Sequence, residues 1–424
     1  MDKKIKTTPL NPWHRKHGAN MAEFGGFDMP LWYDTGVKKE HISVIASAGL
    51  FDTSHMACVT VTQNDALRLL QSCHTRDLSS LKDGKCAYGA ILNEKGHVID
   101  DAIVYRFSRT EYMVCVNAGM GGTVAGHLEK NKKGMAVEIC DLSNQVGKID
   151  LQGKNSAVIL AKLIKDPEAV FKDMVYFSFK GHFDASHACA SQVKLKDNSP
   201  VLVSRSGYTG EFGFELFVLP DQVLSLWNSL LDAGRENQLI PCGLGARDSL
   251  RAGALLPLSH QDIGQWPFIN HPWEFALPFN LDKTGFTKEF IGKDVLVKAM
   301  QSSHGDYTYP FAGENLRKIT AGPASQVIDK NGEAIGRVLT CTTDMAIGWH
   351  KGRILSIASP DLPENFTARG ISCGFVLVNQ PLQSGDQLTL KEKKRTINVT
   401  IVDDIRPDRT ARQKITRFFE FCRS

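Results

Sequence analysis

The sequence predicts an α+β fold with more than one domain, and three observations support this prediction. The chain has 424 residues, too many for one ordinary hydrophobic core, which favours about two to four domains. Helix and strand signals alternate irregularly along the first 300 residues. Helix signals fade past about residue 310 while short strand signals continue, which predicts a small all-β domain, a barrel or a sandwich, at the C-terminal end.

Composition narrows the class of protein. Apolar residues make up 42% and charged residues 23%, the profile of a soluble globular protein, and a net charge of +4 gives no reason to expect nucleic acid. The first 20 residues lack the apolar segment of a signal peptide, and no apolar run is long enough to cross a membrane. The ten cysteines form no C-x-x-C pair, so we expect free thiols in a reducing, cytoplasmic compartment.

Three segments have the apolar periodicity of helices. Residues 36–48 and 64–73 each place apolar side chains on one face. The clearest helix is 221–233, where Asp221 is a candidate N-terminal cap and Gly234 ends the pattern.

The sequence patterns of strands are equally clear. Residues 102–107 and 112–118 predict a hairpin, and residues 201–204 and 213–218 flank a glycine-rich turn. The tail contains four short strand patterns, at 335–341, 375–378, 388–390 and 397–402. Asn331-Gly332 and Ser384-Gly385-Asp386 predict hairpin turns, and the polar segment near 301–315 predicts a linker. We therefore expect one region at 1–300 and a barrel-like domain at 315–424.

The first candidate for chemistry is the pair Asp100-Asp101 at the start of an apolar strand. Successive residues of a strand face opposite sides, so Asp101 shares a side with Ile103 and Tyr105, whereas Asp100 shares the other with Ala102. One carboxylate is then partly removed from water, which is typical of a functional acid. The alternative is a polar pair that only begins the strand.

The second candidate is the segment 206–215, which contains three glycines in seven residues. It is neither a P-loop nor a dinucleotide-binding loop. A functional turn would present Tyr208 to an aromatic ligand while Glu215 accepts hydrogen bonds from it. The alternative is a glycine-rich hairpin turn with only a structural role.

The third candidate is Gly243-Leu244-Gly245-Ala246-Arg247-Asp248. Here Asp248 is a candidate cap for a helix that begins near Ser249, and Arg247 would lie at the helix entrance, where it can hold a carboxylate. The alternative is a surface ion pair. The histidines lack H-x-x-x-H spacing, so we expect no metal site. The sequence shows no G-x-S-x-G nucleophile elbow, which is a turn between a strand and a helix, so it gives no support for a serine hydrolase.

Taken in order along the chain, these segments resemble one family, the glycine cleavage T proteins (aminomethyltransferases). The motifs that carry the resemblance are Phe24-Gly25-Gly26, Asp52-Thr53-Ser54-His55-Met56, Asn93-Glu94-Lys95-Gly96, Asp100-Asp101, 206–215, 243–248 and Phe290-Ile291-Gly292-Lys293. The resemblance covers nearly all of the first 300 residues and is weaker in the tail. It implies a multi-domain, cloverleaf-like arrangement with folate in a central channel.

The resemblance also implies functional roles. Asp101 matches the principal catalytic carboxylate of the family. Matching positions for tetrahydrofolate contacts are Met56, Tyr88, Asn117, Tyr176, Tyr208, Glu215 and Arg247. The implied reaction moves the methylene group of an aminomethyl-lipoyl H protein to tetrahydrofolate, as co-substrate, and releases ammonia during glycine cleavage. The sequence leaves open which C-terminal arginine reaches the folate, Arg406, Arg409 or neither.

Several positions depart from the family pattern. Gly96-His97 stands where Gly-Gly is usual, Ala252-Gly253 replaces Leu-Glu, and Leu258-Ser259-His260 replaces Leu-Tyr-Gly. The positions for folate contacts are kept, whereas the segment 252–260 differs from the family pattern. The resemblance therefore supports the use of folate but leaves the identity of the one-carbon donor open. The alternatives are a tetrahydrofolate-dependent demethylase of a small methylated substrate, with His260 and residues 266–273 lining the donor pocket, and a non-catalytic folate-binding protein.

Overall fold

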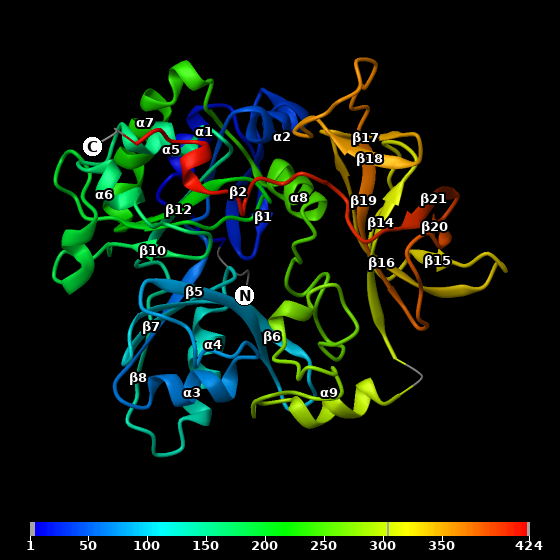
Figure 1. Ribbon diagram of the computed structural model, residues 1–424, viewed down its shortest axis with the longest axis horizontal. Helices are drawn as coiled ribbons and strands as arrows, with labels where there is room; N and C mark the ends of the chain where they lie inside the picture. Colours follow the sequence, from blue (N-terminus) through cyan, green and yellow to red (C-terminus); the bar gives the residue numbers. More distant parts are fainter. Residues whose placement is uncertain (1–4, 303–304, 422–424) are drawn as a thin grey trace.

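Two β-sheets and a closed β-barrel form the three parts of the computed structural model, which describes residues 5–302 and 305–421 (Figure 1). Helices cover the two sheets, and the barrel lies at the opposite end of the molecule. This arrangement confirms the predicted α+β class, with a barrel toward the C-terminal end. None of the helices in these residues is long and apolar enough to cross a membrane.

The first part is a six-stranded sheet. Its strands, in spatial order, are β10 (Phe179–Lys180), β11 (Leu202–Ser204), β12 (Gly213–Val218), β9 (Gly147–Gln152), β3 (Gly49–Asp52) and β13 (Ile240–Pro241). Only the β13–β3 pair is parallel. Apolar side chains of β9 and β12 pack with α5 (Ser156–Ala161), α6 (Pro167–Phe171) and α7 (Val223–Ala233) into one buried cluster. Every residue of β9 and β12 is buried, so their polar side chains face protein and not bulk water.

The second part is a five-stranded sheet that the chain builds between β3 and β9. Its spatial order is β5 (Lys85–Leu92), β6 (Val98–Ser108), β7 (Glu111–Val116), β4 (Ala57–Thr62) and β8 (Glu138–Asp141). The β6–β7 pair is the predicted hairpin. Two helices, α3 (Ala66–Cys73) and α4 (Gly121–Asn131), pack on one face through apolar residues. The other face is left for contacts with the first part.

The N-terminal segment joins these parts. It contains α1 (Asn11–Lys16), the hairpin of β1 (Asn20–Phe24) and β2 (Phe27–Trp32), and α2 (Gly36–Ala46). The structure confirms helices at the three predicted places, α2, α3 and α7. The predicted cap of α7 is wrong, because Asp221 lies in a 3₁₀ turn (Pro220–Gln222) and Gln222 takes the cap position.

The barrel closes through β14 (Tyr307–Gly313), β19 (Ile371–Val378), β16 (Ala334–Asp344), β15 (Gln326–Ile328), β20 (Gln387–Glu392) and β21 (Arg395–Ile401). A further hairpin, β17 (Ile347–His350) and β18 (Arg353–Ser356), lies beside it. Asn331-Gly332 makes the predicted turn between β15 and β16. Ser384-Gly385-Asp386 makes no hairpin, because β20 pairs with β15 and β21 and not with the preceding β19. β14 occupies part of the predicted linker, whose residues 303–304 lie outside the described residues.

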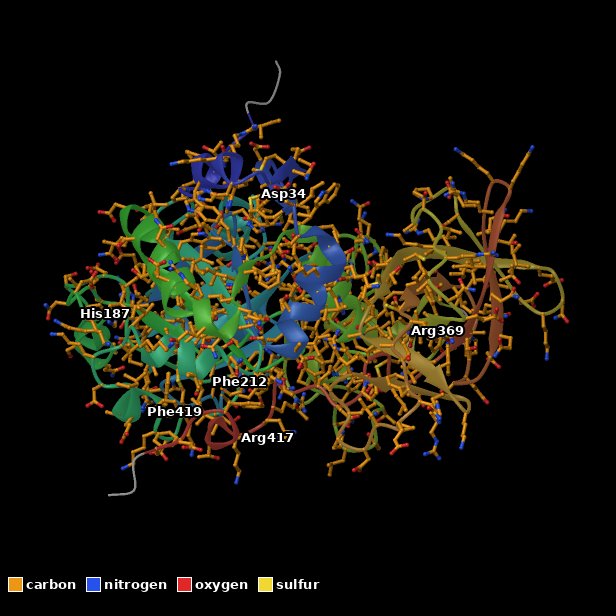
Figure 2. All side chains as sticks on the ribbon, turned by 90° about the horizontal axis from the view of Figure 1, so that it is seen from above. Asp34, His187, Phe212, Arg369, Arg417 and Phe419 are labelled. Atoms are coloured by element: carbon orange, nitrogen blue, oxygen red, sulfur yellow. The ribbon has the colours of Figure 1, made fainter. Side chains whose placement is uncertain are left out.

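Two further segments bind the parts to one another. The segment between α8 (Leu244–Gly253) and α9 (Lys293–Met300) packs as a separate apolar cluster against the five-stranded sheet and the barrel. After β21 the chain returns to the six-stranded sheet, where Ile415 and Phe418 join the cluster around Phe212. Figure 2 shows Phe212, Arg417 and Phe419 together, far from Arg369 of the barrel part. The C-terminal tail therefore does not end with the barrel.

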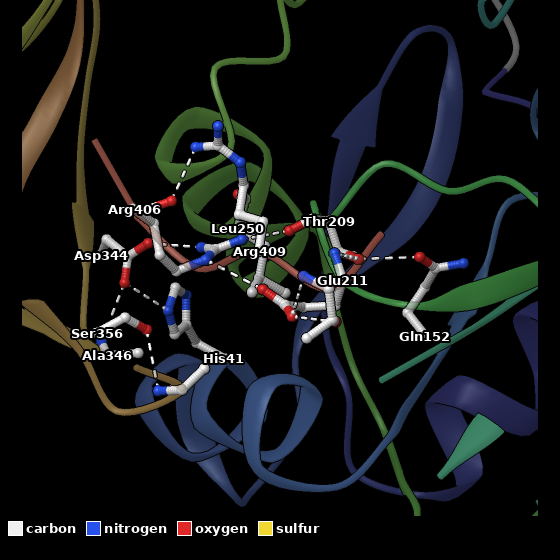
Figure 3. A network of polar contacts seen from close by, with 12 residues as sticks. His41, Gln152, Thr209, Glu211, Leu250, Asp344, Ala346, Ser356, Arg406 and Arg409 are labelled. Atoms are coloured by element: carbon white, nitrogen blue, oxygen red, sulfur yellow. Dashed lines mark hydrogen bonds and ion pairs between the residues drawn. The ribbon is translucent and has the colours of Figure 1, made fainter. Parts of the chain in front are cut away.

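A buried polar network fixes α8 between the parts (Figure 3). His41 of α2 contacts Asp344 of β16 at 2.9 Å and Ser249 of α8 at 2.7 Å. Arg406 of the tail reaches the other Asp344 oxygen at 2.6 Å and Glu211 at 3.2 Å. Because these residues come from five separate segments, the network holds the glycine-rich loop, α8, the barrel and the tail in one arrangement.

Candidate active site

A cavity of about 1700 Å³ lies where the two sheets, α8 and the C-terminal tail meet. All eight predicted site residues line it: Met56, Tyr88, Asp101, Asn117, Tyr176, Tyr208, Glu215 and Arg247. Residues separated by up to 191 positions in sequence (56 to 247) thus reach one space. Among residues 5–302 and 305–421, no group of three His, Cys, Asp or Glu side chains has an arrangement that could hold a metal ion.

Strand β6 presents the carboxylate pair as its alternation predicts. Asp101 is half-buried and lines the cavity, and Tyr105 on the same side packs toward the six-stranded sheet. Asp100 faces away and is fully buried. Its Oδ2 accepts a hydrogen bond from the Asn117 backbone at 2.9 Å, and its Oδ1 accepts one from Ser259 Oγ at 2.9 Å. Strand alternation has therefore separated the pair into an inner carboxyl and a carboxyl at the cavity wall.

Asp101 is held by two neighbours. Tyr88 donates its hydroxyl proton to Oδ2 at 2.8 Å, and Asn117 Nδ2 donates to Oδ1 at 2.6 Å. The same Asn117 amide group also donates to Asp100 at 2.7 Å, so one side chain orients both carboxyls. These bonds leave the Asp101 carboxylate with little freedom to rotate, which is the pre-organisation that a charge-stabilising group needs.

Burial shifts the pKa of both carboxyls. Loss of water and, second, the neighbouring Asp101 charge together raise the pKa of Asp100 to about 7, although hydrogen bonds from Asn117 and Ser259 lower it. Burial also raises the pKa of Asp101, whereas its hydrogen bonds from Tyr88 and Asn117 lower it. Two such close carboxyls titrate as a unit, so the raised pKa values belong to the pair and not to either side chain alone.

A second group of charges surrounds Glu215 and Arg247, which both line the cavity. Lys148 of β9 contacts Asp150 at 2.6 Å and Glu215 of β12 at 2.5 Å, and Arg247 reaches the other Asp150 oxygen at 2.7 Å. Ser206 also donates to Glu215 at 2.5 Å. Burial raises the pKa of Asp150, but Lys148 and Arg247 lower it below its usual range. Two cations and two anions therefore balance, and the Glu215 carboxylate is fixed at the cavity wall.

Sequence reasoning did not single out Lys148, although a signal was present. Lys148, Asp150 and Gln152 alternate with apolar residues along β9. In a strand that is buried throughout, three polar residues on one face indicate a polar site on that face.

Aromatic rings complete the walls. The Arg247 guanidinium lies 4.8 Å from the centre of the Tyr208 ring, and the Tyr208 hydroxyl donates to the Pro257 carbonyl. Tyr176 faces Arg412 of the tail at 6.0 Å. Phe275 lies 5.8 Å from Tyr88 at the cavity edge. The cavity thus has flat apolar surfaces beside fixed charges, a combination that suits a flat ligand with several polar atoms.

The structure corrects two sequence expectations around α8. Asp248 caps no helix, because α8 begins at Leu244 and Gly243 takes the cap position. Asp248 instead pairs with Arg251 at 2.7 Å, one turn along α8. Arg247 therefore lies inside the first turns of α8, not at its entrance, and its guanidinium still reaches the cavity.

The two C-terminal arginines differ in position. Arg406 is fully buried in the network of Figure 3 and does not line the cavity. Arg409, three residues on, lines it and pairs with Asp404. In the predicted 266–273 segment, Trp273 lines the cavity, whereas Trp266 packs beside Arg337 at 5.6 Å.

Comparisons with known proteins show the family to which the fold belongs. The family model described as the GCVT N-terminal domain matches residues 10–282. An aminomethyltransferase of Bacillus cytotoxicus is 31% identical over 383 residues, covering 84% of this chain and 97% of that protein. One from Bacillus licheniformis is 33% identical over 362 residues, covering 81% and 93%. The crystal structure of glycine cleavage system aminomethyltransferase T from Bartonella henselae superposes with a TM-score of 0.74 and 26% identity, covering 94% of this chain and 97% of that one.

The matched relatives and the family model define a transferase. The family model covers more than half of the chain, and relatives above 30% identity extend over most of it. The chain belongs to the glycine cleavage T-protein family, the aminomethyltransferases.

Proposed function

We propose that this enzyme moves the methylene group of the aminomethyl-lipoyl arm of an H protein to tetrahydrofolate and releases ammonia. The observation that carries the proposal is Asp101, a carboxylate fixed by Tyr88 and Asn117 at the wall of a cavity with aromatic sides. Such a group suits a reaction in which positive charge develops and disappears.

The side chains at the cavity fit tetrahydrofolate as co-substrate. When bound, tetrahydrofolate supplies the nucleophilic nitrogens that accept the one-carbon group. Tyr208 and Tyr176 offer ring faces, and Met56 offers a polarisable apolar contact. Glu215 offers a carboxylate that Lys148 and Ser206 already orient, so it can accept hydrogen bonds from ring N–H groups without reorganising. Arg247 stays protonated, so we assign it to orienting the ligand and not to proton transfer.

Asp101 would act as the catalytic carboxylate. Cleavage of the carbon–sulfur bond of an aminomethyl group leaves a cationic carbon–nitrogen unit, and attack by a folate nitrogen makes that nitrogen cationic. In a site screened from water, a fixed carboxylate stabilises these charges far more than it does in bulk solvent. Asp101 can also accept the proton that the attacking nitrogen must lose.

Basic side chains at the cavity support an acidic or carboxylate-bearing partner. Those that line it, apart from the α8 arginines, are Arg76, Lys82, Lys85, Arg409 and Arg412. Opposite charge raises the rate of productive encounter with an acidic carrier and fixes its orientation. Arg409, and not the buried Arg406, is the C-terminal arginine that we assign to the folate side of the cavity.

A second candidate function is demethylation of a small methylated compound with the same acceptor. The observation that favours it is the loop after α8, where Ser259, His260 and Trp273 line the cavity. These side chains could form a pocket for a small donor beside Asp101.

Donor comparison tests the proposal. Purified enzyme is incubated with tetrahydrofolate and either aminomethyl-loaded H protein or small N-methylated amino acids, and 5,10-methylene-tetrahydrofolate and ammonia are measured. We expect turnover with the loaded H protein alone. Turnover only with a small methylated donor would overturn the main proposal in favour of the second candidate, and tetrahydrofolate binding without turnover on any donor would overturn both.

A further inference from the structure

The Asn117 side chain uses both of its amide protons on the carboxylate pair. Its Nδ2 atom donates to Asp100 Oδ1 at 2.7 Å and to Asp101 Oδ1 at 2.6 Å. An amide nitrogen carries two protons, so these two hydrogen bonds account for both. The amide oxygen of Asn117 therefore points away from the two carboxylates.

The carboxylates permit only this orientation of the amide. If the Asn117 amide were turned by 180°, its oxygen would face two carboxylate oxygens, and both hydrogen bonds would be lost. The orientation of an amide is decided by its hydrogen-bond partners, and both partners here are acceptors. The pair thus determines which end of the amide remains for a ligand.

Asp100 fixes the backbone of Asn117 as well as its side chain. The Asn117 N–H group donates to Asp100 Oδ2 at 2.9 Å, so each oxygen of this carboxylate is bound to Asn117. The Asn117 carbonyl accepts a hydrogen bond from the Met120 N–H group at 3.1 Å. Asp100 is fully buried, so water does not compete for these contacts.

The loop after α8 holds the same carboxylate from the other side. Ser259 Oγ donates to Asp100 Oδ1 at 2.9 Å. Asp262 fixes the loop, because its carboxylate pairs with Arg251 and accepts a hydrogen bond from the Leu258 backbone at 3.0 Å. Ser259 therefore extends the rigid arrangement of Asp100 and Asn117 to this loop.

The Asn117 oxygen is open to the cavity. Asn117 lines the cavity, whereas Asp100 does not. Among residues 5–302 and 305–421, no donor reaches the Asn117 Oδ1 atom, and this atom is not fully buried. It is a fixed acceptor beside Asp101, and a bound ligand has to supply the proton for it.

The position of this acceptor indicates which part of the ligand it meets. Under the proposed function, Asp101 faces the folate nitrogen that attacks the one-carbon unit, and Asn117 is bound directly to Asp101. The reduced ring of tetrahydrofolate carries N–H groups at this end of the molecule. The fully oxidised ring of folic acid has nitrogens without protons at the same positions.

We infer that Asp100 is a positioning residue that holds the Asn117 amide oxygen toward the ligand, so that the site selects a reduced folate ring, with its N–H groups, over the oxidised ring. This inference rests on the proposed function for the identity of the ligand. Asp100 acts through Asn117, and Ser259 supports Asp100.

The test measures the affinities of tetrahydrofolate and folic acid by calorimetry and compares their ratio between variants. In Asp100→Asn the new amide brings a donor toward the Asn117 protons, so the Asn117 amide is no longer held in one orientation. We expect the preference for tetrahydrofolate over folic acid to fall at least about tenfold. A purely structural role of Asp100 would weaken both ligands equally, and that result would overturn the inference.

Ser259 provides a milder variant that does not disturb the buried carboxylate itself. Ser259→Ala should lower the preference by about two- to fivefold, and Ser259→Thr, which keeps the hydroxyl donor, should restore it. Ser80→Ala is the matched control, because Ser80 also lines the cavity but lies in the segment before β5, and it should leave the preference unchanged. Equal preferences in Ser259→Ala and the wild type would overturn the inference even if Asp100→Asn does not fold.

Binding also separates this inference from the proposed function. A wild-type enzyme that prefers tetrahydrofolate to folic acid but turns over no H protein would contradict the proposed function, and the variants would still decide the role of Asp100. A wild-type enzyme that binds the two ligands equally would overturn the inference, whatever its turnover.

Discussion

Arg406→Met removes the cation at the centre of the network in Figure 3 while keeping most of the side-chain volume. Arg406 is fully buried and pairs with Asp344, also 0% exposed, and with Glu211. It also donates to the carbonyls of Thr209 and Leu250. The change therefore leaves two buried carboxylates without their shared partner.

The expected cost follows from this burial. Breaking a buried ion pair from one side costs about 3–5 kcal/mol, because the remaining charge stays out of water. Asp344 keeps His41, at 2.9 Å, and Glu211 keeps the Thr410 hydroxyl, at 2.6 Å, so the loss should not exceed this range. The matched control is Arg409→Met, whose side chain is 28% exposed and pairs with a 43% exposed Asp404. An exposed pair of this kind is worth about 0–1 kcal/mol.

Equilibrium unfolding in urea, followed by circular dichroism and tryptophan fluorescence, measures the difference. We expect the free energy of unfolding to fall by about 3–5 kcal/mol in Arg406→Met and by less than about 1 kcal/mol in Arg409→Met. A free energy of unfolding of Arg406→Met within 1 kcal/mol of the wild-type value, or equal losses in the two variants, would refute the idea that this network joins the parts.

Three further changes test the site and the loop beside it. Glu215→Gln should weaken tetrahydrofolate binding at least about tenfold in a fluorescence titration, because it removes a charged acceptor, and an unchanged affinity would remove Glu215 from the site. The raised pKa of Asp100 means that the folded state holds a proton that the unfolded state has lost above about pH 4. The free energy of unfolding of the wild type relative to Asp100→Asn should therefore fall as the pH rises from 5 to 8, and a constant difference would contradict the raised pKa. Gly210→Ala should destabilise the chain by about 1–3 kcal/mol in thermal unfolding, because Gly210 has a φ of 76° and a Cβ there would lie 2.6 Å from the Ala254 Cβ. A wild-type Tm would show that the loop can adapt.

Local patterns predicted local structure well. Period-two alternation placed β6 and β7 and assigned Asp100 and Asp101 to opposite sides, and Asn331-Gly332 fixed the turn between β15 and β16. Apolar spacing located α7, and Gly234 follows its last residue as expected. These features depend on neighbours within a few residues, which the sequence displays directly.

Features that depend on distant partners were missed. The sequence around Ser384 carries turn residues, but barrel closure pairs β20 with β15 and β21, and nothing near residue 384 encodes that choice. The tail returns to the six-stranded sheet through Ile415 and Phe418, whose contacts lie about 200 residues away at Phe212. Lys148 was missed because its partner Glu215 lies in another strand.

The resemblance to a family, and not periodicity, selected the site residues. Composition and spacing alone also allowed purely structural roles for Asp101, the glycine-rich loop and Arg247. Their gathering around one cavity is a property of the three-dimensional fold. The roles assigned to these residues stay predictions until ligand binding and turnover are measured.

Asp101→Asn tests the central claim most directly, because it keeps the shape of the side chain and removes its charge. Single-turnover transfer from aminomethyl-loaded H protein and tetrahydrofolate affinity are measured on the same preparation. We predict that the transfer rate falls at least about 100-fold while the dissociation constant of tetrahydrofolate changes by less than about tenfold, because the carboxylate acts on charge that develops during the reaction. A variant that transfers the group at the wild-type rate would contradict the account.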